Sequence, residues 1–328
     1  MKLFPFFTGL LVSYFVFSSQ VCLGSGDQDS KELVLLPGDH EVSVDSKSLL
    51  ELDSRYQVGS EWGKKALTRE GLDAYPPSFR KAALATLRVG GATGFYVGEY
   101  NGYHIVATNH HVMPRASSCL GRSVRFKLLE KSFVCKKFFG HWTDIDFALF
   151  AIEVNKPEDV TLLSKIKLSM DFNSQPFPGQ ELLTIGFGVA NNPVRRIVGN
   201  IDSDCKVFSE QGDFRFMADP DVLNPGPYKA WSFALGCDVS HGDSGSAIVD
   251  RESGQVVGII WTGKIPKASK VQNSDYLDDM LASNSPEIWV ELNYAVPASK
   301  IKEFLQSLIN RGSLDQDTTE TLAQFISQ

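Results

Sequence analysis

The chain contains a long succession of short segments rich in β-branched and aromatic residues, each interrupted by Gly, Pro or Asn. The segments run from Thr86 to Val296 and include LRVGGATGFYVG, YHIVATN, SVRFKLL, FALFAIEV, ELLTIGFG, RRIVGNID, GSAIVD, QVVGIIWTG and WVELNYAV. Frequent strands with turn signals between them are typical of an antiparallel sandwich or barrel. The sequence therefore predicts an all-β fold over most of its length.

Helical patterns lie at the two ends of this β-rich region. Residues 77–85 are predicted to form a short helix. Near the end of the chain one apolar stripe is formed by Ile301, Phe304, Leu305 and Leu308. Pro297 stands just inside the start of this pattern and Gly312 just after its end, which is the usual asymmetry of helix ends. The polar segment 315–328 can add one more helix.

The first 24 residues have the pattern of a secretory signal peptide. Lys2 precedes a short apolar segment that ends at Phe17, and small and polar residues follow up to Gly24. A membrane anchor is the alternative, but about 15 apolar residues fall short of the roughly 20 that span a bilayer. Cys22 leaves a lipoprotein open as a second alternative. Residues 25–75 are polar and acidic without a clear period, so we expect a leader or propeptide there.

Charge and composition limit the kinds of molecule that the protein is expected to bind. The formal net charge is -7 and no long basic run occurs, so nucleic acid is not expected as a partner. No CxxC motif or Cys/His ligand spacing predicts a metal site, and we expect no cofactor.

Four cysteines follow the predicted signal peptide, and an exported chain would join them in two disulfides. Three connectivities are possible. We favour the near pairs Cys119–Cys135 and Cys205–Cys237. The export signal and the cysteines together predict a secreted or periplasmic protein.

The segment Gly242-Asp-Ser-Gly-Ser-Ala-Ile-Val249 has the pattern of a nucleophile loop. A serine between glycines, on a tight loop before an apolar strand, exposes its hydroxyl. Such a loop also frees backbone N–H groups to point at one position. Acyl transfer needs both, a nucleophile and donors for the developing oxyanion.

A base and a carboxylate are also available. His110 and His111 end a predicted strand, and strand alternation allows only one of them to face a cleft. Asp144 and Asp146 precede the apolar segment FALFAI. Asp146 directly begins that segment and is better placed to be buried, whereas Asp144 is expected to be solvated.

These motifs resemble those of trypsin-like serine proteases of the chymotrypsin fold. TNHHV, DFALF and GDSGSAIV occur in the order His, Asp, Ser, and the closest resemblance is to the bacterial branch with the HtrA proteases and glutamyl endopeptidases. The family motif Thr-Asn-x-His-Val places the base at His111. The resemblance implies a triad of His111, Asp146 and Ser244, with an oxyanion hole at Gly242 and Ser244. His110 should then point to solvent or into a surface hydrogen bond.

The resemblance also implies a fold and a function. It extends from residue 91 to about residue 310 and implies two six-stranded antiparallel β-barrels with a C-terminal helix. We therefore expect a protease domain over residues 76–312 and an extension over residues 313–328. The implied activity is that of a secreted serine endopeptidase acting on proteins or peptides. The sequence leaves its oligomeric state open.

Departures from the family concern two aspartates. Asp243 stands where HtrA proteases usually have Asn, and a buried carboxylate there needs a partner. That partner is either an internal Arg or an amine released by removal of the leader. Asp238 lies where trypsins carry the aspartate of the specificity pocket, which implies preference for Lys or Arg before the scissile bond. Its alternative role is that of a loop-stabilising acceptor.

Other residues of the substrate pocket follow from the same resemblance. Trp261 and Gly263, in the segment GIIWTG, are implied to contact substrate. Ile260 stands where glutamyl endopeptidases have histidine, which argues against a preference for Glu.

Two other functions fit the sequence less well. A catalytically silent trypsin-fold binding protein usually lacks a triad residue, and all three are present here. An esterase of the α/β-hydrolase fold needs the order Ser, Asp, His and a GxSxG motif. Neither feature is found in this chain, so that class is excluded.

Overall fold

The computed structural model describes residues 33–34, 42–43, 53–223 and 227–328. The chain divides into two compact units, Met1–Leu50 and Glu51–Gln328. In the first unit, β1 (Leu33–Val34) pairs antiparallel with β2 (Val42–Ser43). The predicted signal peptide lies outside the described residues, as does most of the leader before residue 53.

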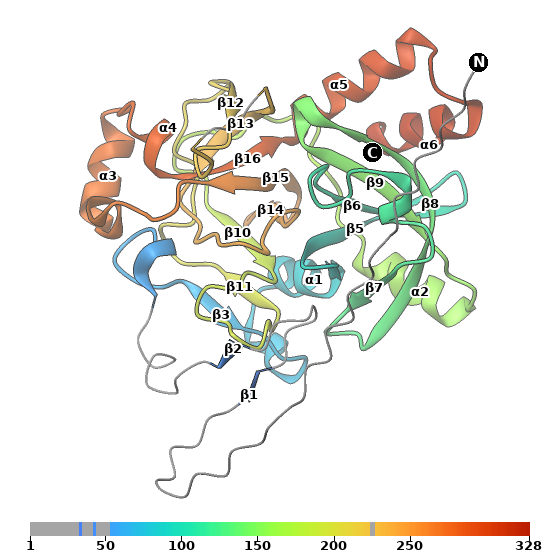
Figure 1. Cartoon of the computed structure of the whole chain (residues 1–328), viewed down its shortest axis with the longest axis horizontal. Helices are drawn as coiled ribbons and strands as arrows, with labels where there is room; N and C mark the ends of the chain where they lie inside the picture. The colour runs from blue at the N-terminus through green and yellow to red at the C-terminus, as the bar shows by residue number, and fades with distance from the viewer. Residues whose placement is uncertain (1–32, 35–41, 44–52, 224–226) are drawn as a thin grey trace, which may run out of the picture. The chain divides into compact units, whose positions relative to one another are not determined.

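The second unit contains a closed barrel of six antiparallel strands in the order β4-β5-β6-β9-β8-β7 (Figure 1). The strands are β4 (Thr86–Val89), β5 (Ala92–Tyr100), β6 (Tyr103–Thr108), β7 (Ser123–Phe126), β8 (Lys131–Trp142) and β9 (Phe147–Ile152). The register shifts at Gly98 in β5 and before Gly140 in β8, and both glycines have positive φ. Such bulges bend long strands and allow a sheet to close. The first predicted barrel is confirmed.

The second sheet differs from the prediction of another six-stranded barrel. It is an open antiparallel sheet of eight strands in the order β12-β13-β16-β15-β14-β10-β11-β3. The strands are β3 (Lys64–Ala66), β10 (Leu182–Gly186), β11 (Val198–Asn200), β12 (Arg215–Ala218), β13 (Lys229–Leu235), β14 (Ala247–Asp250), β15 (Val256–Gly263) and β16 (Asn293–Pro297). Two short strands, β12 and β3, extend its edges and do not pair with each other. One of them, β3, comes from the segment expected to be a leader.

The helices of the second unit lie around these sheets. They are α1 (Pro77–Ala85), α2 (Pro157–Ile166), α3 (Ser274–Ala282), α4 (Ile288–Glu291), α5 (Ala298–Arg311) and α6 (Gln316–Ile326). Helix α5 matches the predicted apolar stripe, with Ile301 and Leu305 buried, and it ends at Gly312 in the left-handed conformation. No helix in the described part of the chain is long and apolar enough to cross a membrane.

Helix α6, in the segment expected to be a C-terminal extension, packs on the folded unit. The side chain of Phe325 is fully buried and packs against Phe147 of β9 and Phe172. Asp317 accepts a hydrogen bond from Tyr103 and forms an ion pair with Lys137 of β8. Figure 1 shows α6 beside the first barrel, whereas α5 contacts α6 and the strands β15 and β16 of the open sheet.

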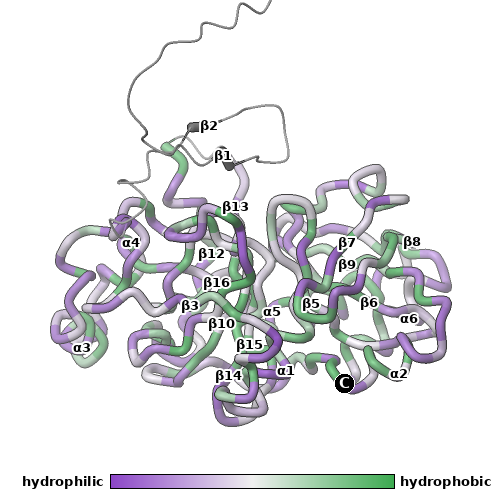
Figure 2. Tube along the Cα trace, turned by 90° about the horizontal axis from the view of Figure 1, so that it is seen from below, coloured by the Kyte–Doolittle hydropathy of each residue, from purple (hydrophilic) through white to green (hydrophobic). Residues whose placement is uncertain are grey.

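One large hydrophobic core joins the two sheets. It contains Leu149 of the barrel, Leu183 and Val249 of the open sheet, and Leu305 of α5. Hydrophobic stretches follow the strands of both sheets in Figure 2. The loops that cross between the sheets are thus held on both sides by packed strands.

The described residues contain two disulfides, and they join the near pairs favoured above. Cys119 is bonded to Cys135 of β8, and Cys205 to Cys237, and all four residues are buried. Disulfides indicate an extracytoplasmic compartment, because cytosolic thiols are kept reduced.

Candidate active site

The candidate base and its carboxylate lie next to each other at one end of the first barrel. Strand β6 ends at Thr108, and His111 lies in the turn that follows. Its Nδ1 atom is 2.7 Å from Oδ2 of Asp146, and its backbone N–H donates to Oδ1 of the same carboxylate at 3.1 Å. Asp146 is fully buried, whereas Asp144 is exposed. The buried carboxylate therefore fixes both the ring and the backbone of His111.

The backbone of Asp146 is held in an uncommon conformation. Asp146 has a φ of 34°, in the left-handed region, directly after the 3-10 turn Thr143–Ile145. The side-chain amide of Asn109 donates to its carbonyl oxygen at 2.9 Å. Aspartate is one of the few residues that tolerate this region. The turn directs the carboxylate back towards the turn that carries His111.

The charges around His111 raise its pKa. Burial alone would lower the pKa, but the negative charge of Asp146, its hydrogen bond and the charge of Asp219 outweigh burial. The bond to Asp146 also places a proton on Nδ1, since a carboxylate only accepts. The Nε2 atom of the neutral ring is then the one free to act as a base.

His110 is placed differently from the expectation of a solvent-facing or surface-bonded ring. Its ring stacks on His141 at a centroid distance of 4.6 Å and lies near Tyr228. Among the described residues its Nδ1 atom is buried and has no hydrogen-bond partner. Both histidines lie in the turn beyond β6, so strand alternation does not govern them. Burial lowers the pKa of His110, which favours a neutral packed ring.

The loop around Ser244 is tied to both sheets. Its carbonyl oxygen accepts from the N–H of Thr93 in β5 at 3.0 Å. The N–H of Gly245 donates to Ile260 of β15, also at 3.0 Å. Gly242 and Gly245 have φ values of 97° and 83°. A Cβ atom at Gly245 would lie 2.1 Å from the Thr93 carbonyl oxygen. Glycine is therefore required for this loop to approach β5.

Two backbone N–H groups of this loop have no hydrogen-bond acceptor among the described residues. Within the described ranges, neither the N–H of Gly242 nor that of Ser244 donates a hydrogen bond to the protein. These are the two positions expected to form the oxyanion hole. Ser246, the other serine of the motif, is fully buried, so its hydroxyl is not accessible to substrate.

Two cavities meet at His111 and Ser244, since both residues line each of them. The first has a volume of about 500 Å³ and is also lined by Ala92, Met113 and Arg122. The second has a volume of about 350 Å³, and Trp261 and Gly263 line it as expected. A chain crossing from one cavity to the other would pass between the candidate base and the candidate nucleophile.

The sequence predicted Asp238 at the second cavity, but other acidic side chains line it. Asp219 and Asp221 line it, whereas Asp238 does not. Asp238 is fully buried, and its carboxylate accepts from the N–H groups of Val58 and Gly63 at 2.8 and 2.7 Å. Burial raises the pKa of Asp238 to about 7, against the two N–H bonds that lower it. Its contacts are those of a loop-stabilising acceptor.

Sequence reasoning missed Lys64, whose ammonium forms an ion pair with Asp243. The partner of Asp243 is thus an internal lysine rather than the expected Arg or released amine. Lys64 lies in the polar segment interpreted as a leader, where no periodic pattern indicates a strand. Within the described part of the chain, no cluster of His, Cys, Asp and Glu side chains is arranged to hold a metal ion.

Comparisons with known proteins agree with this architecture. Residues 92–259 match the family model of the trypsin-like peptidase domain. The chain therefore belongs to the trypsin-like peptidase family. A comparison with curated protein sequences finds no match.

Crystal structures of Rv3671c from M. tuberculosis are similar to this chain. A mutant in an inactive form is 16% identical, with a TM-score of 0.47, over 76% of this chain and 99% of that chain. The Rv3671c protease in its inactive form is 18% identical, with a TM-score of 0.45, over 70% and 92% of the two chains. Its active form is 16% identical, with a TM-score of 0.44, over 73% and 86%.

Proposed function

We propose that this protein is a serine endopeptidase in which Ser244 is the nucleophile, His111 the general base and Asp146 the orienting carboxylate. The observation that carries the proposal is the His111–Asp146 hydrogen bond of 2.7 Å, in a chain where His111 and Ser244 line the same two cavities. A base held by a buried carboxylate, with a half-buried serine lining the same cavities, is compatible with the arrangement that acyl transfer uses.

The reaction follows from the protonation states of these groups. Nε2 of His111 takes the proton of the Ser244 hydroxyl as Oγ bonds to the carbonyl carbon of the scissile peptide. The imidazolium then gives this proton to the leaving amine, the C–N bond breaks, and an acyl-enzyme remains. Water, deprotonated by the same ring, hydrolyses the ester and returns Ser244 to its starting form.

The backbone N–H groups of Gly242 and Ser244 are proposed to bind the oxyanion. Both lack a protein acceptor among the described residues, so they need not break a bond to bind a ligand. Donors fixed in advance stabilise the charge that develops in the transition state.

The experiment that tests this proposal is labelling by a fluorophosphonate, followed by peptide mapping and peptide hydrolysis. The wild-type chain should be labelled at Ser244. Ser244→Ala should lose labelling and about 10⁶-fold in kcat. Ser246→Ala is the matched control and should keep both, because its hydroxyl is buried. Near-normal hydrolysis by Ser244→Ala would refute Ser244 as the nucleophile. A wild-type chain that is neither labelled nor active would favour a binding protein.

We further propose that substrates carry Lys or Arg before the scissile bond, and that Asp219 and Asp221 supply the recognition. Both line the second cavity together with Trp261 and Gly263. A carboxylate in such a cavity favours a cation over an apolar or acidic side chain. Asp238 is proposed to have a structural role, since both its oxygens are used by backbone N–H groups.

The last part of the proposal concerns the export of the protein and the bounds of its protease domain. We propose that residues 1–24 are a signal peptide and that the protein is secreted or periplasmic, which the two buried disulfides support. We also propose that the protease domain includes residues 53–75, because β3 pairs with β11. Any leader that is removed would then end before residue 53.

A further inference from the structure

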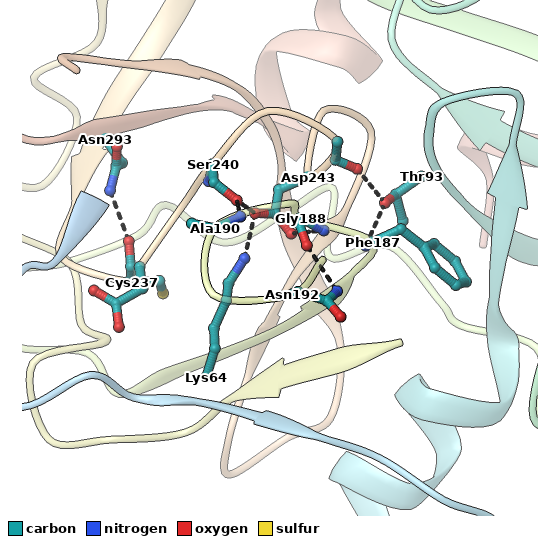
Figure 3. Close-up of polar contacts among 12 residues, drawn as sticks. Lys64, Thr93, Phe187, Gly188, Ala190, Asn192, Cys237, Ser240, Asp243 and Asn293 are labelled. Carbon is teal, nitrogen blue, oxygen red and sulfur yellow. Dashed lines mark hydrogen bonds and ion pairs between the residues drawn. The ribbon is translucent and has the colours of Figure 1, made fainter. Parts of the chain in front are cut away.

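The residue that precedes the candidate nucleophile is held by a buried ion pair. The ammonium of Lys64 contacts Oδ2 of Asp243, and the two side chains are 2% and 1% exposed. Asp243 adjoins Ser244, and Lys64 is the first residue of β3. Figure 3 shows the lysine side chain pointing towards the carboxylate of Asp243. The ion pair thus links the edge of the second sheet to the candidate oxyanion hole.

The same carboxylate joins two loops around the site. Oδ2 accepts from the N–H of Ser240 at 2.8 Å and from its hydroxyl at 3.2 Å, and Oδ1 accepts from the N–H of Gly188 at 3.1 Å. A Cβ atom at Gly188 would lie 2.2 Å from the carboxylate. The carboxylate is therefore closely packed between the loop after β10 and the loop that carries Gly242 and Ser244.

A second aspartate of the same loop holds β3 in position. Asp238 accepts the N–H of Gly63, and Asp243 binds the side chain of the next residue, Lys64. In β3 itself, Lys64 pairs with Asn200 and Lys65 with Gly199 of β11. Lys65 is exposed on the same strand. The lysine that reaches the loop is thus fixed by its backbone on both sides.

Removal of the ammonium would leave a buried carboxylate without a counter-charge, which is strongly unfavourable. The carboxylate would turn towards water and release the N–H groups of Ser240 and Gly188. Gly242 lies between these anchors and Ser244, and it has a positive φ. The orientation of the N–H groups of Gly242 and Ser244 therefore depends on the ion pair.

We propose that Lys64 is a positioning residue that sets the oxyanion hole of the uncut chain, so that the site forms without the release of a new chain end. The inference rests on the proposed function of Ser244 and assigns its regulation. It makes the segment before α1 a component of the active enzyme. Cleavage between β3 and α1 would not be needed for activity.

The test uses full-length variants and one peptide substrate. Lys64→Met should lower kcat about 10²–10³-fold, the cost of losing an oxyanion donor, and should change KM much less. Lys65→Met removes a charge from the exposed face of the same strand and should keep wild-type kcat. A folded Lys64→Met variant, checked by circular dichroism, with wild-type kcat would overturn the inference.

Chemical rescue separates the charge from the space that the side chain fills. Lys64 lines a cavity of about 280 Å³, so truncation of its side chain to Ala would open a path from that cavity to Asp243. Lys64→Ala should regain at least tenfold in kcat with propylammonium and gain nothing from 1-propanol, which has the same length but no charge. Equal rescue by both compounds, or by neither, would contradict the proposed role.

A paired variant covers the case in which loss of Lys64 alone prevents folding. Lys64→Met/Asp243→Asn buries no net charge, so it should fold and keep kcat well above that of Ser244→Ala. A folded paired variant as inactive as Ser244→Ala would overturn the inference. Labelling of Ser244 in the wild-type chain separates this failure from failure of the proposed function itself.

Discussion

The two sheets of the second unit hold their parts of the site in different ways. The first barrel fixes His111 and Asp146 by contacts between residues 35 apart in sequence. The open sheet fixes the Ser244 loop by an ion pair between residues 179 apart, with the Lys64 side chain reaching from an edge strand. In the first barrel, His111 and Asp146 hold each other in place. The Ser244 loop, in contrast, depends on β3, which comes from a distant segment of the chain. The base should therefore be robust to distant changes and the nucleophile loop sensitive to them.

The largest expected effects test the contacts within the first barrel. His111→Ala should lower kcat about 10⁶-fold, as removal of the serine does. Asp146→Asn should lower it about 10⁴-fold, because the imidazole loses its correct tautomer. Both should be measured as kcat on one peptide substrate.

Matched neighbours serve as controls for these two variants. His110→Ala and Asp144→Asn should keep most activity, since His110 stacks on His141 and Asp144 is exposed. If His110→Ala were inactive and His111→Ala active, the assignment of the base would be wrong.

The two disulfides provide the next test of the comparison. Loop entropies predict that loss of Cys119–Cys135, with a separation of 16, destabilises by about 3 kcal/mol. Loss of Cys205–Cys237, with a separation of 32, should cost about 4 kcal/mol. Paired Cys→Ala variants and thermal unfolding measure both free energies.

Measurements of kcat should distinguish the two disulfides further. Cys237 directly precedes Asp238, which holds Val58 and Gly63 near β3. Loss of the second bridge should therefore lower kcat of the folded protein, whereas loss of the first should leave it near the wild-type value. Equal effects of the two bridges on kcat would contradict the proposed asymmetry between the sheets.

The features predicted from the sequence are those determined by local pattern. The strands of the first barrel, the apolar stripe of α5 and the buried position of Asp146 follow from periodicity over a few residues. Strand β3 has only three residues, Lys64–Ala66, two of which are lysines. It is ordered by pairing with β11 and by Asp243, and no local pattern reports such long-range contacts. The number of strands in the second sheet was missed for the same reason.

The placement of Asp238 shows another limit of the sequence. Its offset from Ser244 is compatible with the floor of a substrate pocket and equally with a structural acceptor. The choice depends on whether the N–H groups of Val58 and Gly63 approach it, and these come from a distant segment. Asp219 and Asp221 belong to no recognisable sequence motif, so the sequence did not predict them as residues of the cavity.

The smallest expected effect concerns Asp219, which lines the second cavity and whose charge helps to raise the pKa of His111. The reaction needs the neutral imidazole, so kcat/KM should rise with pH through the pKa of His111. Asp219→Asn removes a negative charge, lowers that pKa and should move the acid limb of the profile to lower pH. It should also reduce the preference for Lys or Arg over an apolar side chain by about tenfold, on the order of one lost pocket contact. Asp238→Asn is the control: it should lower stability through the N–H groups it holds but leave both the preference and the acid limb in place. If instead Asp238→Asn abolished the preference and Asp219→Asn did not, the recognition of substrate would belong to the buried loop rather than to the cavity lining.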